Sequence, residues 1–127
     1  MKIEHVAMYV KNLEVAKDFY CKYFNGVSNN KYHNKTTGFE SYFISFDTGA
    51  RFELMSKPNL VEQEEAQNRY GYIHIAFSVD SNEAVDTLTK QLENDGYTVT
   101  SYPRTTGDGY YESCVLDPDG NVVEITV

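Results

Sequence analysis

Two histidines and two glutamates recur in this sequence at nearly equal separations. His5 precedes Glu53 by 48 residues, and His74 precedes Glu124 by 50 residues. Imidazole nitrogens and carboxylate oxygens are the donors that bind borderline divalent transition metals such as Ni, Co, Zn, Mn or Fe. Each residue alone has an ordinary structural explanation, as a hydrogen-bonded core histidine or a solvent-facing glutamate. All four together, in register in both halves of the chain, favour a metal site with positions left open for water or substrate oxygens.

These four residues lie in stretches whose alternation predicts half-buried strands. In "GYIHIAFSVD" (residues 71–80) the bulky side chains alternate with His74, Ala76 and Ser78, and residues 2–10 alternate in the same way around His5. Successive strand side chains point to opposite faces of a sheet. We therefore expect the four polar side chains to point away from the packed face, which in 71–80 is formed by Ile73, Ile75, Phe77 and Val79.

Two stretches show helical spacing. "NLEVAKDFYCKYFNG" (12–26) predicts a helix that Asn12 caps and Asn25-Gly26 ends. "DSNEAVDTLTKQLENDG" (80–96) predicts a second helix, with a capping box of Asp80 and Glu83 at its start and Gly96 after its end.

The order of a strand, a helix and three strands occurs twice. The later strands are expected in "GVSNNKYHN", "ESYFISFDTG" and "ARFELMS" of the first half, and in "YTVTSYP", "YYESCVLD" and "NVVEITV" of the second. "IEHVAMYV" aligns with "YIHIAFSV", and "GARFELM" with "GNVVEIT", which is a repeat signal. The sequence predicts an α+β fold in which two pseudo-symmetric βαβββ modules form a curved mixed-sheet cup with the helices outside. Residues 1–127 are expected to form a single domain, with module one at about 1–56, a linker at about 57–71 and module two at about 72–127.

Composition excludes several classes of partner. The formal net charge of the 127 residues is −8 and no basic cluster stands out, which argues against nucleic acid and anionic membrane surfaces. No apolar run approaches the length of a membrane span, and the first residues lack a signal-peptide pattern. Cys21 and Cys114 have neither metal-binding nor redox spacing. We therefore expect free thiols in a reducing cytoplasm.

Four stretches resemble the vicinal oxygen chelate superfamily: "EHVAMYVKNLEVAKDFY", "GARFELM", "GYIHIAFSVD" and "LDPDGNVVEI". That superfamily contains glyoxalase I, fosfomycin-resistance thiol transferases, bleomycin-resistance proteins, methylmalonyl-CoA epimerase and extradiol dioxygenases, and the resemblance covers essentially the whole chain. The full His/Glu/His/Glu set is most similar to glyoxalase I, the lactoylglutathione lyase. The resemblance implies one divalent transition metal (Ni, Co, Zn, Mn or Fe) bound by His5, Glu53, His74 and Glu124.

The same resemblance implies a metal-dependent lyase or isomerase. Its substrate would be the hemithioacetal of an α-ketoaldehyde, converted through a metal-chelated enediolate, with Glu124 as the base and Glu53 as its pseudo-symmetric alternate. Two other functions stay open: a fosfomycin-resistance-like thiol transferase or other metal enzyme of the superfamily, and a non-catalytic drug- or metabolite-binding protein of the bleomycin-resistance type. The expected partners are a small-molecule substrate, such as a thiol adduct, and a second copy of the chain in a homodimer. The site then lies within one chain or is shared between two.

Two positions depart from the pattern of the glutathione-using enzymes. Those enzymes tend to have an arginine four residues after the first histidine, where this chain has Tyr9, and an asparagine four residues after the first glutamate, where it has Lys57. We therefore expect a thiol other than glutathione, or no thiol.

Other side chains are weaker candidates for the site. Arg104 and Lys57 are possible contacts for an anionic substrate. Tyr42, Tyr110 and Tyr111 are either lining residues or ordinary core and edge-strand tyrosines, and His33 is expected to be exposed and uninvolved.

Overall fold

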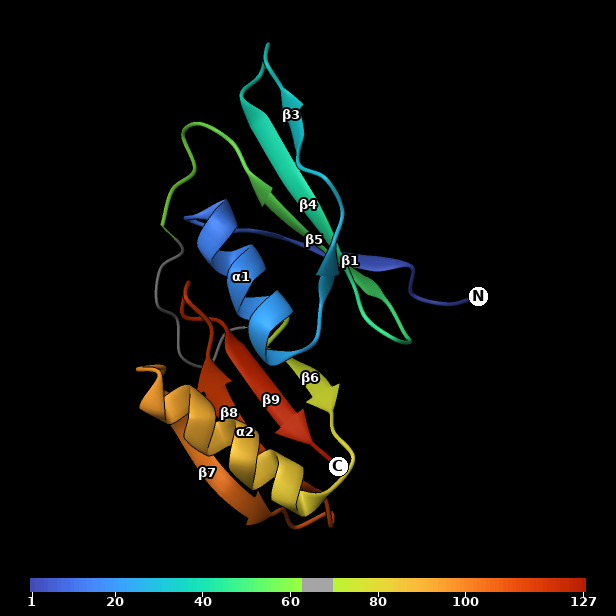
Figure 1. The fold of residues 1–127 in the computed structure, drawn as a ribbon, viewed down its shortest axis with the longest axis vertical. Helices are drawn as coiled ribbons and strands as arrows, with labels where there is room; N and C mark the ends of the chain where they lie inside the picture. Colours follow the sequence, from blue (N-terminus) through green and yellow to red (C-terminus); the bar gives the residue numbers. More distant parts are fainter. Residues whose placement is uncertain (63–69) are drawn as a thin grey trace. The chain divides into compact units, whose positions relative to one another are not determined.

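The computed structural model describes residues 1–62 and 70–127. The described residues divide into two compact units, Met1–Tyr70 and Gly71–Val127 (Figure 1). Each unit packs a helix on a mixed sheet, so the predicted α+β fold with two βαβββ-like modules is confirmed. Part of the expected linker at about 57–71 falls on residues 63–69, which lie outside the described residues.

The first unit is built around a parallel pair of strands that are distant in sequence. Strands β1 and β5 pair in parallel, and the sheet order is β1-β5-β4-β2, with β3 also paired to β4. The elements are β1 (His5–Tyr9), α1 (Leu13–Tyr23), β2 (Val27–Ser28), β3 (Tyr32–Asn34), β4 (Phe39–Ser45) and β5 (Arg51–Ser56). The single strand expected in "GVSNNKYHN" is therefore two short strands. Asn29 lies between them, and its side-chain oxygen accepts a hydrogen bond from the Phe43 backbone N–H at 2.8 Å.

The second unit repeats this topology. Strands β6 and β9 pair in parallel, and the sheet order is β6-β9-β8-β7. The elements are β6 (His74–Ser78), α2 (Asn82–Asn94), β7 (Val99–Thr105), β8 (Tyr111–Leu116) and β9 (Val122–Thr126). Helix α2 contacts β7, β8 and β9, and Figure 1 shows it lying along one face of this sheet.

The helix ends follow the sequence signals, with one exception. Asn12 caps α1 as predicted, its side chain accepting from the backbone N–H groups of Glu14 and Val15 at 3.1 Å. Gly96 follows the end of α2 with φ 92°, as expected of a helix stop. The predicted Asp80–Glu83 capping box is wrong. Ser81 is the cap, since it directly precedes the first helical residue, and its hydroxyl accepts from the Ala84 N–H at 3.2 Å.

The core of each unit lies between its helix and one face of its sheet. Helix α1 buries Leu13, Ala16, Phe19, Tyr20 and Tyr23, and the facing strands bury Ile44, Phe52 and Leu54; helix α2 buries Val85, Thr89 and Leu92, and its strands bury Val115, Val123 and Ile125. Ile73 was expected in this second core, but it is 74% exposed because β6 begins one residue later. The side chains on the opposite sheet face remain available for a site.

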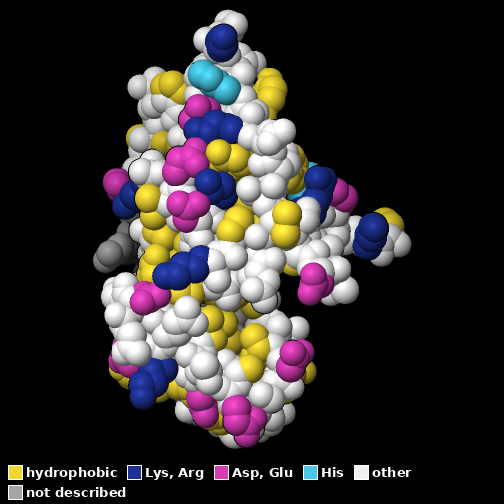
Figure 2. Space-filling view, viewed as in Figure 1, with side chains coloured by type: hydrophobic (Ala, Val, Ile, Leu, Met, Phe, Trp, Pro, Cys, Tyr) yellow, Lys and Arg dark blue, Asp and Glu magenta, His cyan; other side chains and the backbone are white. Residues whose placement is uncertain are grey.

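Charged side chains of both signs gather on the surface of the first unit, as Figure 2 shows. Part of this surface is a cluster around Glu14, whose carboxylate lies 2.7 Å from Lys31 Nζ and 3.0 Å from Lys17 Nζ and accepts a hydrogen bond from the Tyr42 hydroxyl at 3.1 Å. The hydrogen bonds from Lys31 and then Lys17 lower the pKa of Glu14 to about 2. The cluster connects α1 to the sheet that it covers.

Candidate metal centre

The parallel pairing of β1 with β5 brings His5 and Glu53 together. Ala7 lies opposite Glu53 in the register, and His5 is two residues earlier on the same strand face. The Nε2 atom of His5 lies 3.9 Å from Oε2 of Glu53. The imidazole is 41% exposed and the glutamate 19%, so the carboxylate is shielded while the ring stays accessible.

The second unit contains the same arrangement in the same register. Ala76 lies opposite Glu124, and His74 is two residues earlier on β6. The Nε2 atom of His74 lies 3.5 Å from Oε2 of Glu124, with the ring 39% and the carboxylate 14% exposed. The His–Glu repeat in the sequence is therefore also a structural repeat.

The donor separations within each pair suit two ligands of one ion. Donors that each lie about 2.1 Å from a transition metal are roughly 3 to 4 Å apart, depending on the angle between them. Both observed separations, 3.9 Å and 3.5 Å, fall in this range. Neutral imidazole and carboxylate also form a chemically suitable donor set for such an ion.

Each His–Glu pair lies within one unit. Among residues 1–62 and 70–127, no group of three or more His, Cys, Asp or Glu side chains is gathered in a form that could hold a metal ion. Each unit on its own therefore offers two donors from the predicted set.

The surroundings of His5 include charged residues that the sequence analysis missed. Glu4 hydrogen-bonds to Nδ1 of His5 and forms an ion pair with Arg51. The hydrogen bond from His5 and the contact with Arg51 lower the pKa of the Glu4 carboxyl. The Arg51 guanidinium also lies 4.2 Å from the ring centroid of Phe43. The alternation expected over residues 2–10 would place Glu4 and His5 on opposite faces, but β1 begins at His5, so Glu4 lies outside the strand.

The residues that lie opposite His74 and Glu124 in the strand register carry no formal charge. Val122 lies opposite His74, and Cys114 lies opposite Glu124. Burial raises the pKa of the Cys114 thiol, and the negative charge of Glu124 adds to this effect. Cys21 and Cys114 are both free thiols, as expected. Arg104, one of the weaker candidates for contact with an anionic substrate, lies 3.8 Å from Glu112.

Two of the candidate tyrosines lie on the helix side of their sheets. Tyr42 is buried and donates its hydroxyl hydrogen bond to Glu14 of α1. Tyr111 donates to Asp86 of α2 at 2.7 Å. These two tyrosines are therefore core and helix-contact residues, while Tyr110 is 55% exposed. His33 is exposed on β3, as predicted.

Tyr9 and Lys57 contact each other. Nζ of Lys57 lies 4.9 Å from the Tyr9 ring centroid, a cation–π distance. Tyr9 follows His5 by four residues on the same face of β1. The two residues that depart from the glutathione-using pattern thus form a pair at the end of the face that carries His5.

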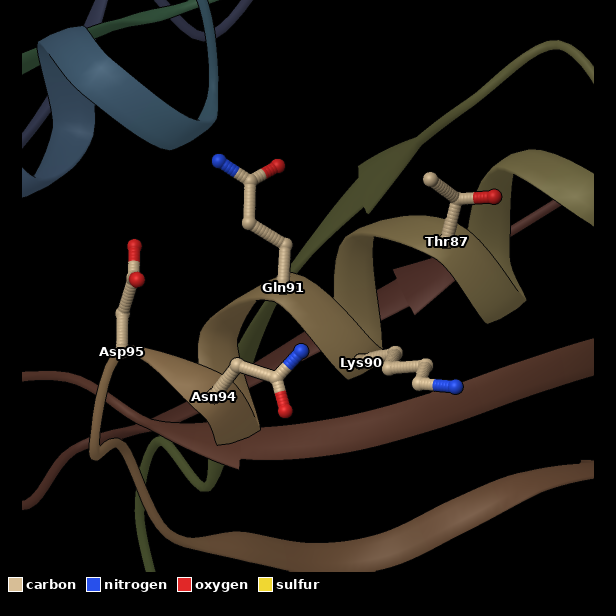
Figure 3. Close-up of a pocket in the computed structure, with 5 residues that line it drawn as sticks. All are labelled: Thr87, Lys90, Gln91, Asn94 and Asp95. Atoms are coloured by element: carbon tan, nitrogen blue, oxygen red, sulfur yellow. The ribbon is translucent and has the colours of Figure 1, made fainter.

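Five polar side chains on the outer surface of α2 line a shallow hollow (Figure 3). They are Thr87, Lys90, Gln91, Asn94 and Asp95. Helix α2 covers the sheet face that carries Val123 and Ile125, whereas Glu124 points from the opposite face. The hollow is therefore separate from the His74–Glu124 pair.

Comparison with known proteins identifies the family. Residues 2–125 match the family model described as the Glyoxalase/Bleomycin resistance protein/Dioxygenase superfamily. The chain belongs to this superfamily. YqjT of Bacillus subtilis (strain 168), described as an uncharacterized protein, is 30% identical to this member of the superfamily over 129 residues, which cover 97% of this chain and 96% of YqjT. The resemblance seen in the sequence is confirmed.

Solved structures share the fold. The V278E mutant of glyoxalase I from Zea mays matches with a TM-score of 0.79 at 20% identity over 98% of this chain and 44% of the maize chain. The trypanothione-dependent glyoxalase I of Leishmania major matches with a TM-score of 0.77 at 18% identity over 99% of this chain and 86% of that chain. This superfamily member thus spans less than half the length of the maize enzyme.

In the part of the chain that the structure describes, no helix is long and apolar enough to cross a membrane.

Proposed function

We propose that this chain is a metal-dependent lyase or isomerase of the glyoxalase I type. Residues 1–127 act as one vicinal-oxygen-chelate domain, and His5, Glu53, His74 and Glu124 hold one divalent transition metal. The substrate is the hemithioacetal of an α-ketoaldehyde. When bound, the metal supplies Lewis acidity toward adjacent substrate oxygens.

One observation carries this proposal: the same His–Glu pair occurs at the same strand register in both units. In each pair Nε2 faces a carboxylate oxygen, at 3.9 Å in the first unit and 3.5 Å in the second. The packing of the core between helix and sheet does not require an imidazole and a carboxylate on the opposite face of the sheet. Their repetition supports a shared chemical task.

Glu124 is the proposed base, which removes a proton from one carbon of the substrate and returns a proton to its neighbour. Its carboxylate is 14% exposed, so little water competes for it. Cys114 lies beside it in the register and adds no charge as a protonated thiol. Glu53 is the pseudo-symmetric alternate, since its carboxylate occupies the matching position in the first unit.

The expected thiol differs from glutathione. Glutathione carries two carboxylates, for which an arginine offers a rigid pair of donors. At the positions concerned this chain has Tyr9 and Lys57, and the ammonium of Lys57 lies against the Tyr9 ring. A tyrosine and a single mobile ammonium do not reproduce that pair of donors.

A turnover screen tests the proposal. Metal-free protein is reconstituted separately with Ni(II), Co(II), Zn(II), Mn(II) and Fe(II), and methylglyoxal is supplied with several low-molecular-weight thiols. Turnover with at least one thiol, lost on removal of the metal, supports the proposal. Metal binding with turnover only of an oxirane substrate favours the thiol transferase, and tight binding of a small molecule with neither metal nor turnover favours the binding protein.

We also propose that the protein is a homodimer in the cytoplasm. Light scattering at micromolar concentration should give the mass of two chains, and a monomer would contradict it. Mixing His5→Ala with Glu124→Gln protein distinguishes shared sites from sites within one chain. Restored activity after confirmed subunit exchange indicates that each site draws on both chains.

A further inference from the structure

His5 is held by a closed set of contacts that the other half of the chain does not have. Its Nδ1 hydrogen-bonds to the Glu4 carboxylate. A neutral imidazole carries its proton on one nitrogen and a lone pair on the other. A proton fixed on Nδ1 by Glu4 leaves the lone pair on Nε2, the atom that faces Glu53.

Arg51 makes two contacts with Glu4. Its carboxylate forms an ion pair with the Arg51 guanidinium, and its backbone oxygen accepts from the Arg51 N–H at 3.0 Å. The guanidinium lies over the Phe43 ring, and the Phe43 ring meets the His5 ring edge to face with centroids 5.6 Å apart. Glu4, His5, Phe43 and Arg51 therefore form a closed cluster around one imidazole.

The matching positions in the second unit cannot form this cluster. Ile73 precedes His74 as Glu4 precedes His5, and it is 74% exposed. Val122 lies opposite His74 as Arg51 lies opposite His5, and Cys114 lies opposite Glu124 as Phe43 lies opposite Glu53. Since the second unit keeps the same topology without these residues, the fold does not require them.

From this asymmetry we infer that Glu4 is a positioning residue for His5. Arg51, which lies over the Phe43 ring, holds Glu4 in place. Glu4 selects the tautomer with Nε2 free and fixes the direction of the ring. The inference rests on the proposed metal site, because the consequence of a fixed ring is a stronger ligand. Hydrogen bonds of this kind to the second nitrogen of a ligating histidine contribute about 10–100-fold to metal affinity.

Metal titration tests the consequence. Zn(II) is titrated into metal-free protein by calorimetry for wild type, Glu4→Ala, Glu4→Gln and the matched control Ile73→Ala. Glu4→Ala should weaken Zn(II) binding about 10–100-fold. Glu4→Gln keeps an oxygen that accepts from Nδ1–H and should retain more of the affinity than Glu4→Ala, while Ile73→Ala should leave binding unchanged. Equal affinity of wild type and Glu4→Ala overturns the inference.

A second measurement needs no metal and separates this inference from the metal site itself. The chain has three histidines, so ¹⁵N spectra of the rings can be assigned with His33→Ala and His74→Ala protein. At about pH 8.5, where an ordinary imidazole is neutral, wild-type His5 should carry its proton on Nδ1. Glu4→Ala should shift His5 toward the other tautomer. A wild-type proton on Nε2, or an unchanged tautomer in Glu4→Ala, overturns the inference even if Zn(II) binds. Failure of wild type to bind any metal, with the tautomer as expected, counts against the proposed function and leaves the positioning role standing.

Discussion

The two units share a strand register but differ in what surrounds it. In both units a histidine lies two residues before the alanine that faces a glutamate on a parallel strand. Around His5 are a carboxylate, a guanidinium and an aromatic ring, whereas the matching residues around His74 are Ile73, Val122 and Cys114. The repeated histidine and glutamate are the donors of the proposed metal site. The side chains around them differ, so each pair has its own electrostatic surroundings.

This difference bears on the roles of the two glutamates. Glu53 shares its strand face with the Arg51 guanidinium, while Glu124 lies beside the thiol of Cys114 and has no matching arginine at position 122. We propose Glu124 as the base and Glu53 as its pseudo-symmetric alternate, and the different surroundings of the two carboxylates can be compared by mutation.

The largest expected effect compares the two glutamates directly. Glu53→Gln and Glu124→Gln each exchange one carboxylate ligand for an amide, but only Glu124→Gln also removes the proposed base. At saturating metal, kcat of Glu124→Gln should be lower than that of Glu53→Gln by about 100-fold or more, as loss of a general base predicts. Steady-state kinetics with the best thiol adduct measure both values. Equal losses, or a larger loss in Glu53→Gln, would show that the assignment of the base is wrong.

An intermediate effect concerns the Tyr9–Lys57 pair, for which the matching position after His74 holds Ser78. Wild type should show a kcat/KM for the glutathione hemithioacetal well below about 10⁶ M⁻¹s⁻¹, the range of efficient enzymes. Installing the arginine and asparagine by Tyr9→Arg with Lys57→Asn should raise this value about tenfold, as one added charge-assisted contact predicts. Ser78→Ala serves as a control on the other half. Efficient use of glutathione by wild type would contradict the hypothesis that Tyr9 and Lys57 disfavour this thiol.

The smallest effect concerns stability and again separates the halves. Glu14 in α1 is bound by Lys31, Lys17 and Tyr42, whereas Glu83 holds the matching place in the first turn of α2 and is exposed. Since the Glu14 side chain is 47% exposed, solvent screening reduces the expected loss in Glu14→Gln to about 1 kcal/mol of unfolding free energy. Glu83→Gln should lose less than about 0.5 kcal/mol. Urea denaturation at about pH 7 measures both differences.

The pH dependence of this effect has a definite sign. The pKa of Glu14 is lowered from 4.5 to about 2 in the folded protein. A lowered carboxyl pKa stabilises the folded state above the unfolded value, and this contribution is lost as the pH falls from about 4.5 toward 2. The difference between wild type and Glu14→Gln should therefore shrink in urea denaturation near pH 3. A difference that grows on acidification would contradict this account of Glu14.

Much of the fold follows from local patterns in the sequence. Alternation around His5 and His74, together with the self-alignment of the two halves, predicted the two repeated modules and the sheet face that carries histidine and glutamate, but it did not predict which strands pair in parallel. The helix ends at Asn12 and Gly96 were also predictable, because capping depends on nearby residues.

The remaining features depend on contacts that alternation does not encode. Ser81 rather than Asp80 caps α2, because the helix begins at Asn82. The sequence pattern did not predict the first helical residue to within one position. Ile73 is exposed because the strand starts after it, and Glu4, which lay within the strand expected at 2–10, likewise precedes the first residue of β1. The pairing of Glu4 with Arg51 joins residues 47 positions apart, so it becomes visible only once β1 lies beside β5.

The most direct test of the central claim is the metal content of histidine variants. Wild type, the His33→Ala control and the His5→Ala, His74→Ala double variant are reconstituted under identical conditions, dialysed and measured by elemental analysis, with circular dichroism confirming that all three are folded. Wild type and His33→Ala should retain one divalent transition metal per set of His5, Glu53, His74 and Glu124, and the double variant should retain almost none. Full metal occupancy in the folded double variant would contradict the account.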